Sequence, residues 1–297
     1  MHDTIFVLTD FSHAAEPAVQ RAALLARQRG SALVLAHLKD SGPPDVGDRL
    51  PRLAAMLARR HRVQVRTMGA LDQSGLRNAV AAQAGLLVMG WPPPGSGAPG
   101  WRSRLSSWLF GLRLMWRLPC PLLVVRAPAA RPYERLLVAL GGEPGPAIAL
   151  LRAASELAPS AELELFHVID TRQETRLLAA QARRTSLRDY REALDSHGHR
   201  HLRRLSDTLD ARRNRLMYTL GRGDPADQIL VQQDYGRAEL VVTGRGQRSA
   251  WVELLLGSTA GRLVQRMRCD LLVWPENTGA GRCQNVDHAR SRLGITR

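Results

Sequence analysis

Lysine is nearly absent from this sequence of 297 residues, since Lys39 is the only lysine among 42 Lys and Arg residues. Aromatic residues are also scarce, at 5% of the chain. The net charge of +15 would suit nucleic-acid or acidic-membrane partners. However, few aromatic side chains are available to stack on bases, and the charge is spread through both halves and the tail. We therefore expect no specific nucleic-acid partner and attribute the arginine excess to composition.

Cysteine is limited to three residues, and this odd number without metal-ligand spacing argues against a disulfide framework or a zinc site. Cys120 and Cys269 precede equivalent apolar strands, so we expect both to be small buried side chains. No stretch approaches the ~20 apolar residues of a membrane span. The sequence also opens without a basic segment followed by an apolar run. We predict a cytoplasmic protein with no membrane span.

Several catalytic and metal-binding patterns are missing as well. A P-loop needs Gly-Lys-Ser/Thr, and the single lysine, Lys39, does not stand in that pattern. The Gly-x-Ser-x-Gly motif that carries the nucleophile of α/β-hydrolases is also absent. The tract around His197 and His201, preceded by Asp195, has helical spacing for a metal, but arginines crowd it and Gly198 weakens a helix. We interpret the tract as a solvated surface and expect no catalytic residues and no resident metal.

What the sequence does contain is an internal repeat, which determines the architecture before any motif is considered. The matching apolar segments are Ile5–Asp10 with Leu136–Gly141, Ala32–His37 with Ala161–His167, Leu86–Gly90 with Leu240–Gly244, and Cys120–Val125 with Cys269–Trp274. The length suits two domains. We predict a first domain at 1–127, a linker at 128–133, a second domain at 134–276 and a disordered tail at 277–297.

Short apolar strands alternate with helical runs, which predicts an α/β fold with buried parallel sheets covered by helices on both faces. The expected strands are Thr4–Thr9, Ala32–His37, Val63–Thr67, Gly85–Gly90 and Pro121–Arg126, then Arg135–Leu140, Glu162–Ile169, Arg215–Leu220, Glu239–Thr243 and Asp270–Trp274. The expected helices are Ala15–Arg29, Leu50–Arg60, Leu76–Gln83 and Ser103–Arg117, then Pro146–Leu157, Arg172–Leu209, Pro225–Tyr235 and Ser258–Arg266.

Four segments resemble the universal stress protein family, in particular its tandem two-domain members. They are the run from Gly244 to Ser258, the run Gly221–Ile229, and the two Cys-x-Leu-Leu-Val endings. The resemblance implies two doubly wound, five-stranded parallel sheets of strand order 3-2-1-4-5, adenine-nucleotide α-hydrolase-like. It also implies that the two domains pair through their last strands as a pseudo-dimer.

The family's nucleotide motif is best preserved in the second half. In an open parallel sheet a ligand binds where the strand order reverses, here beyond the first and fourth strands of a domain. Gly244 ends the fourth strand and lets backbone approach a phosphate. A helix opening at Gly257-Ser258 favours an anion. By resemblance, the residues expected to bind ATP with its magnesium are Ala139, Val168, Gly244, Gly257, Ser258 and Thr259.

Each half has nevertheless lost part of the family pattern. Asp10 matches the carboxylate expected at the end of the first strand, whereas the second half has Gly141 there. The middle glycine of the second-half motif is replaced by Gln247. In the first half, Gly90 is followed by Trp91 and three prolines, which have no N–H to donate. We therefore expect ATP binding to be weak or absent.

These observations predict a stress-response regulatory or binding module rather than a dedicated enzyme. One alternative is an ATP-binding switch or weak ATPase that uses the second domain. Another is a platform for an apolar ligand or a protein, built on the tryptophan-rich insertion at 91–108 and the long basic helix at 172–209. A homodimer is a further assembly to test, and the protein partners cannot be named from the sequence.

Overall fold

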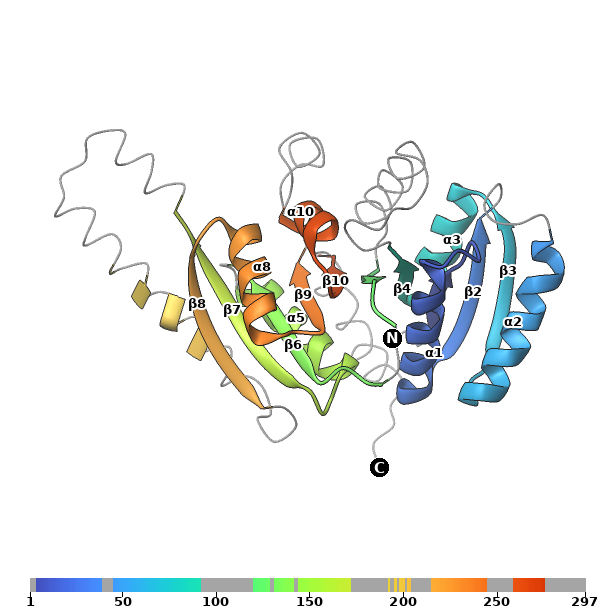
Figure 1. Ribbon diagram of the computed structural model, residues 1–297, viewed down its shortest axis with the longest axis horizontal. Coiled ribbons are helices and arrows are strands. Elements are labelled where there is room, and N and C mark those ends of the chain that lie inside the picture. Colours follow the sequence, from blue (N-terminus) through green and yellow to red (C-terminus); the bar gives the residue numbers. More distant parts are fainter. Residues whose placement is uncertain are drawn as a thin grey trace, which may run out of the picture.

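Ten strands form one continuous sheet in the computed structural model of the chain (Figure 1). The structure describes residues 4–38, 45–91, 120–128, 131–141, 144–171, 215–244 and 259–275, with isolated positions between 192 and 203. The strand order is β3-β2-β1-β4-β5-β10-β9-β6-β7-β8. Each half therefore has the predicted 3-2-1-4-5 order.

The elements lie close to their predicted positions. The first half contains β1 (Thr4–Leu8), α1 (Ala15–Arg29), β2 (Ala32–Leu38), α2 (Val46–His61), β3 (Val65–Leu71), α3 (Gln73–Gln83), β4 (Ala84–Gly90) and β5 (Leu122–Val125). The second contains β6 (Arg135–Leu140), α5 (Pro144–Leu157), β7 (Glu162–Asp170), β8 (Leu216–Gly223), α8 (Pro225–Gly236), β9 (Leu240–Gly244), α10 (Thr259–Arg266) and β10 (Asp270–Trp274). The helix predicted at 103–117 and most of the one predicted at 172–209 lie outside the described residues.

The two halves join through their last strands, as the resemblance implied. Strands β5 and β10 pair antiparallel, with Leu123 opposite Leu272, whereas neighbouring strands within each half pair in parallel. Apart from Asp270, these two strands are apolar along their whole length, because the sheet is covered on both faces. The join therefore lies inside a common core.

Two buried layers fill the space on either side of this sheet. Ile5 and Val7 point to the face covered by α1, α2 and α5. Phe6, between them in the sequence, points to the face covered by α3, α8 and α10. This alternation is the period-two pattern of a strand. Each layer runs across both halves, so the helices of the two domains share their cores.

Helix boundaries follow local chemistry. Helix α1 ends at Gly30, whose φ of 64° lies in the left-handed region that favours glycine. Helix α2 begins at Val46, four residues before the predicted Leu50, so Pro51 lies inside the helix. No helix among the described residues is long and apolar enough to cross a membrane.

Candidate functional site

Three of the predicted nucleotide-binding residues meet at the carboxyl edge of the second half-sheet. Ala139, Val168 and Gly244 stand on β6, β7 and β9, which are neighbours in the order β9-β6-β7. Ala139 is buried, while Val168 and Gly244 are half-buried. Thr259 is the first residue of α10, which packs on the face to which Ala139 contributes. Gly257 and Ser258 lie outside the described residues.

Among the described residues, no backbone segment crowds Gly244. A Cβ atom built on this glycine would have Leu150 Cδ1, at 3.6 Å, as its nearest neighbour in the described part of the chain. That distance is an ordinary van der Waals contact. The end of β9 is therefore not closed by a described backbone segment.

The equivalent glycine of the first half is closed in. A Cβ on Gly90 would stand 1.8 Å from the carbonyl oxygen of Ala14 and 2.8 Å from Cα of Ala15. The end of β4 thus packs backbone to backbone on the start of α1. Trp91, the next residue, donates its backbone N–H to the carbonyl oxygen of Val125 at 3.0 Å and packs against the core. Trp101, Trp108 and Trp116, the other tryptophans of the first half, lie outside the described residues.

Asp10, the carboxylate retained by the first half, is engaged locally. Its Oδ1 accepts a hydrogen bond from the backbone N–H of Ser12 at 2.9 Å. Phe11 between them has φ of 61°, so the chain turns sharply here before α1. The carboxylate is exposed. Local turn formation therefore accounts for this aspartate without a ligand.

The matching position of the second half, Gly141, faces open space. The residue is exposed, and a Cβ built on it would meet no atom of the described residues within 4 Å. A carboxylate side chain would fit there sterically. The loss of the family aspartate is therefore a loss of chemistry rather than of space.

The Gly221–Ile229 motif forms the turn from β8 into α8. A Cβ on Gly221 would lie 2.6 Å from the Phe166 ring, so the ring packs directly on the glycine backbone. Gly223 has φ of 137°, which side-chain-bearing residues rarely adopt. Asp224 then caps α8 by accepting from the N–H groups of Ala226 and Asp227 at 3.0 and 3.2 Å. The described residues of this motif have clear structural duties.

Ion pairs tie α10 to the start of α8. Arg262 contacts Asp224 at 2.8 Å and Asp227 at 3.1 Å, and Arg266 also pairs with Asp227. These two carboxylates neutralise the two guanidinium groups. The arginines of α10 are therefore committed to helix packing and are not offered to a phosphate.

The same contacts change the pKa of Asp224, the residue that caps α8. Partial desolvation acts to raise the pKa of Asp224, but hydrogen bonds from Arg262 and from the Asp227 and Ala226 N–H groups outweigh it and lower the pKa. Because the folded pKa is depressed, the carboxylate stabilises the fold above its unfolded pKa and loses that contribution as pH falls through the folded value. Asparagine can still cap the helix, so the loss comes from the charge that pairs with Arg262 and faces the helix N-terminus. We expect Asp224→Asn to reduce stability at pH 7 by about 0.5–1 kcal/mol, and by less at pH 3. Urea unfolding at both pH values checks this, and an equal loss at both would contradict it.

The two equivalent histidines stand in β2 and β7, and His167 is half-buried. His37 is buried, at 5% exposure. The ring nitrogen Nδ1 of His167 lies 3.1 Å from the carbonyl oxygen of Leu140. This backbone hydrogen bond is the structural role expected for a histidine in an apolar strand. In the predicted metal-like tract, Asp195 is bound by Arg222 at 2.7 Å, and the described residues hold no group of three metal-ligating side chains. His197 and His201 lie outside them.

The two described cysteines are buried and have no disulfide partner within the described residues. Burial raises the pKa of both thiols to about 12. A thiol with so high a pKa carries almost no thiolate at neutral pH and is a poor nucleophile. Both therefore act as small core side chains, as the sequence predicts.

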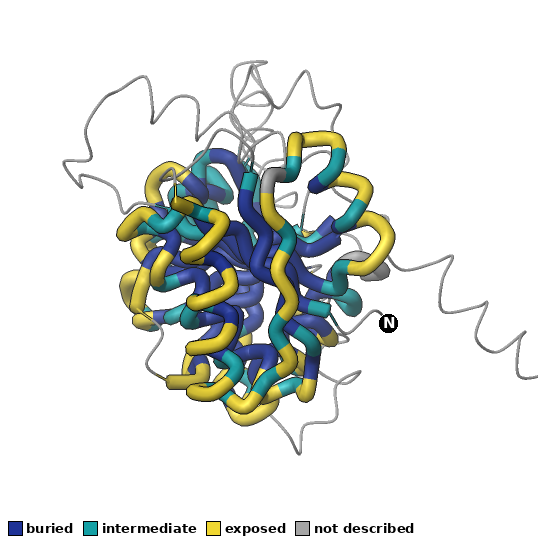
Figure 2. Tube along the Cα trace, turned by 90° about the vertical axis from the view of Figure 1, so that its right-hand side faces the viewer, coloured by how far each residue is buried: buried dark blue, intermediate teal, exposed yellow. Residues whose placement is uncertain are grey.

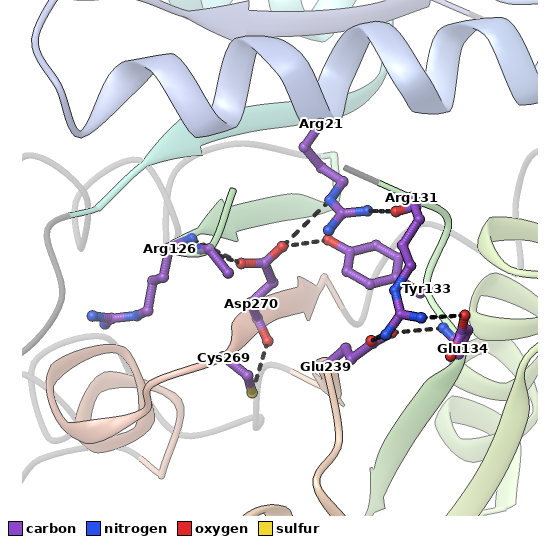
Figure 3. A network of polar contacts seen from close by, with 9 residues as sticks. Arg21, Arg126, Arg131, Tyr133, Glu134, Glu239, Cys269 and Asp270 are labelled. Carbon is purple, nitrogen blue, oxygen red and sulfur yellow. Dashed lines mark hydrogen bonds and ion pairs between the residues drawn. The ribbon is translucent and has the colours of Figure 1, made fainter. Parts of the chain in front are cut away.

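The most extensive polar network of the described residues is one that the sequence patterns missed (Figure 3). Asp270 on β10 is fully buried. It accepts hydrogen bonds from the Tyr133 hydroxyl at 2.6 Å and from the N–H groups of Arg126 and Ala127 at 2.8 and 3.2 Å. The oxygen that binds Tyr133 also lies 3.6 Å from Nε of Arg21 on α1. One carboxylate thus joins the second domain to α1 and to the segment that connects the domains.

Arg21 has two further contacts besides its ion pair with Asp270. It stacks over the Tyr133 ring, 3.9 Å from the centroid, and donates to the carbonyl oxygen of Arg131 at 2.8 Å. The pKa of Tyr133 is raised, mainly by burial and then by the negative charge of Asp270. A charged residue within the apolar Cys269–Trp274 strand was the available signal, because the first copy has Pro121 at that position.

The comparisons with known proteins agree with this architecture. The family model described as "Universal stress protein family" matches residues 1–67 and 132–275. A universal stress protein from Archaeoglobus fulgidus aligns with a TM-score of 0.60 at 15% identity, covering 92% of this chain and 96% of that one. A protein of unknown function from Pseudomonas aeruginosa PAO1 aligns with a TM-score of 0.59 at 22% identity, covering 92% of each chain.

A putative universal stress protein from Pseudomonas aeruginosa UCBPP-PA14 gives a TM-score of 0.59 at 20% identity, covering 92% of this chain and 93% of that one. A search of curated proteins gives no match. The structural alignments extend over both halves, so they concern the tandem arrangement and not a single domain. The family model covers more than half of the chain, and it shows that this chain belongs to the universal stress protein family.

Proposed function

We propose that the protein is a cytoplasmic, non-enzymatic binding module of the stress response, with one weak adenine-nucleotide site in its second domain. The first domain (1–127) and second domain (134–276) have separate roles in this proposal. The first supports the scaffold, and the second retains the residues that would wall an adenine ring and approach phosphates. Any magnesium would arrive with the nucleotide.

The observation that carries the proposal is the contrast between the two equivalent glycines. Gly90 is pressed against the backbone of Ala14, whereas Gly244 meets only the side chain of Leu150 at ordinary contact distance within the described residues. Phosphates need backbone N–H groups within reach at this edge of the sheet. The second domain therefore offers the better site, and Asp10 in the first domain stays occupied with Ser12.

Weak binding follows from what the second domain lacks. Gly141 supplies no carboxylate for a ribose, and Arg262 is neutralised by Asp224 and Asp227. Gln247 replaces the glycine at which backbone would approach a phosphate. An ATP-driven switch or weak ATPase would use this same site. We rank it second because no described side chain in the site is placed as a general base.

The missing chemistry can be restored by substitution. In a Gly141→Asp, Gln247→Gly double variant, we expect ATP–Mg²⁺ affinity to rise at least tenfold over the natural chain, which corresponds to about 1.4 kcal/mol. The new carboxylate at position 141 would enter open space, and the new glycine would return backbone access. Isothermal titration of both proteins with ATP and magnesium measures the change.

The matched control is Asp10→Asn, which alters the carboxylate of the first domain. We expect it to leave the affinity of the double variant unchanged, because that domain has no nucleotide site in this proposal. If Asp10→Asn instead abolished binding, the nucleotide would sit in the first domain. If the double variant bound no better than the natural chain, the second-domain site would be wrong.

A further inference from the structure

Positive charge is concentrated on one part of the first domain, along α2 from its middle to its end, at the end of α1 and at the start of β3. We call this region the basic end, and it consists of Arg27, Arg29, Arg52, Arg59, Arg60, Arg62 and Arg66. All but Arg29 are exposed, and Arg29 is half-exposed. The sequence suggested that charge is spread through both halves, and the fold shows a local concentration as well.

The basic end lies in two stretches of sequence without an acidic residue, and the nearest carboxylate on α2 is Asp48 in its first turn, four residues before Arg52. The sequence has no Asp or Glu between Pro17 and Leu38, or between Arg49 and Leu71. Within the described part of the chain, none of the seven arginines forms an ion pair. In the second domain Arg215, Arg262 and Arg266 are paired with carboxylates, whereas Arg152, Arg237 and Arg268 form no ion pair among the described residues. The basic end therefore carries uncompensated charge.

The arginines act on a common region. Helices α1 and α2 pack against each other. Burial lowers the pKa of His61, at the end of α2, and the positive charges of Arg60 and of Arg27 on α1 lower it further. A single ring thus senses charge from the ends of both helices. The positive potential is shared between the two elements.

Part of this charge forms a stripe along α2. Arg52, Met56 and Arg59 are spaced i, i+4 and i+7, which places them on one face of a helix. In Figure 2 the side of the first domain that carries α2 in Figure 1 faces the viewer, and Arg52, Met56 and Arg59 are all exposed. The helix is ~24 Å long at 1.5 Å per residue, comparable with about seven base pairs of a duplex.

Arginine at a helix C-terminus is also explained by the helix dipole. That explanation covers Arg59 and Arg60 in the last turn of α2 and Arg27 and Arg29 in the last turn of α1. It does not cover Arg52, which lies in the middle of α2, or Arg66 on β3. The charge extends beyond what the dipoles require.

We propose that the basic end binds the phosphate backbone of double-helical nucleic acid without reading its sequence. Guanidinium groups bind phosphates through two parallel hydrogen bonds. The scarcity of aromatic residues removes base stacking but does not affect backbone contacts. A membrane-surface helix would need a broad apolar face, whereas Met56 is the only large apolar side chain exposed on the described residues of the first domain.

The test compares two triple variants of the full chain by fluorescence anisotropy with a short labelled duplex of random sequence. One variant carries Arg52→Gln, Arg59→Gln and Arg60→Gln. We expect it to bind at least tenfold more weakly than the natural chain in ~50 mM salt. The slope of log affinity against log salt should also become shallower by about 3, since each lost phosphate contact contributes ~0.9.

The matched control carries Arg152→Gln, Arg237→Gln and Arg268→Gln on the second domain. These arginines are exposed and form no ion pair within the described residues, so the net charge changes equally. We expect its affinity to stay within a factor of about two of the natural chain. If both variants lost the same duplex affinity, the loss would follow from net charge alone and the proposal would be overturned. Binding to phosphatidylserine vesicles without duplex binding would overturn it in favour of a membrane.

Discussion

Replacing Asp270 by alanine is expected to lower the free energy of unfolding by about 3–5 kcal/mol. The side chain is fully buried and is the shared acceptor for Tyr133 and two backbone N–H groups. Its removal would leave those donors without their acceptor. It would also leave the charge of Arg21 buried with no carboxylate beside it. Breaking one side of a buried ion pair is costly because the partner charge stays desolvated.

Urea unfolding followed by circular dichroism measures this loss. Asp234→Ala is the matched control, since Asp234 is an exposed aspartate on α8, and its change should stay within about 0.5 kcal/mol. Asp270→Asn should fall between the two, because the amide oxygen still accepts hydrogen bonds while the charge is gone. A loss at Asp270→Ala no larger than at Asp234→Ala would show that the network does not hold the two domains together.

The second large effect is expected at Gly90. Gly90→Ala should lower the free energy of unfolding by about 3 kcal/mol or more, because its Cβ would stand 1.8 Å from the carbonyl oxygen of Ala14. The obstacle is backbone, so β4 and α1 must move apart to admit the methyl group. If the obstacle were a flexible side chain, it could move aside with a much smaller loss of stability.

Gly244→Ala provides the internal control, because the two glycines occupy equivalent positions in the repeat. Its Cβ would meet Leu150 at 3.6 Å within the described residues, so we expect a cost below about 1 kcal/mol. Thermal or urea unfolding of the pair gives the comparison directly. Similar losses at both positions would remove the structural contrast on which the proposed assignment of the nucleotide site rests.

Most of the fold could be predicted because the repeat and the apolar strands carry it. The bounds of α1, β6 and β10 agree with prediction to the residue, and the 3-2-1-4-5 order follows from the family resemblance. The strand ends differ by a few residues, as at β8, which continues through Gly221 to Gly223. Glycines there are required by the Phe166 ring and by a φ of 137°, and neither is visible in a linear pattern.

The interdomain network could not be predicted in the same way. Asp270 and Arg21 are far apart in the sequence and come together only because β5 pairs with β10. A single aspartate in an apolar strand indicates that a partner exists, but spacing does not identify it. Two of the predicted nucleotide-binding residues, Gly257 and Ser258, lie outside the described residues, as does Gln247, which replaces the motif's middle glycine. The site proposal therefore rests on Ala139, Val168, Gly244 and Thr259.

The most direct test of the account is isothermal titration of the natural chain with ATP and magnesium. Weak binding in the second domain alone predicts a dissociation constant no tighter than about 100 µM, which corresponds to roughly −5.5 kcal/mol, and no more than one nucleotide per chain. Two nucleotides per chain would contradict it, since the first domain would then bind as well. A low-micromolar dissociation constant would contradict it too, because Gly141 and Gln247 would not have weakened the site.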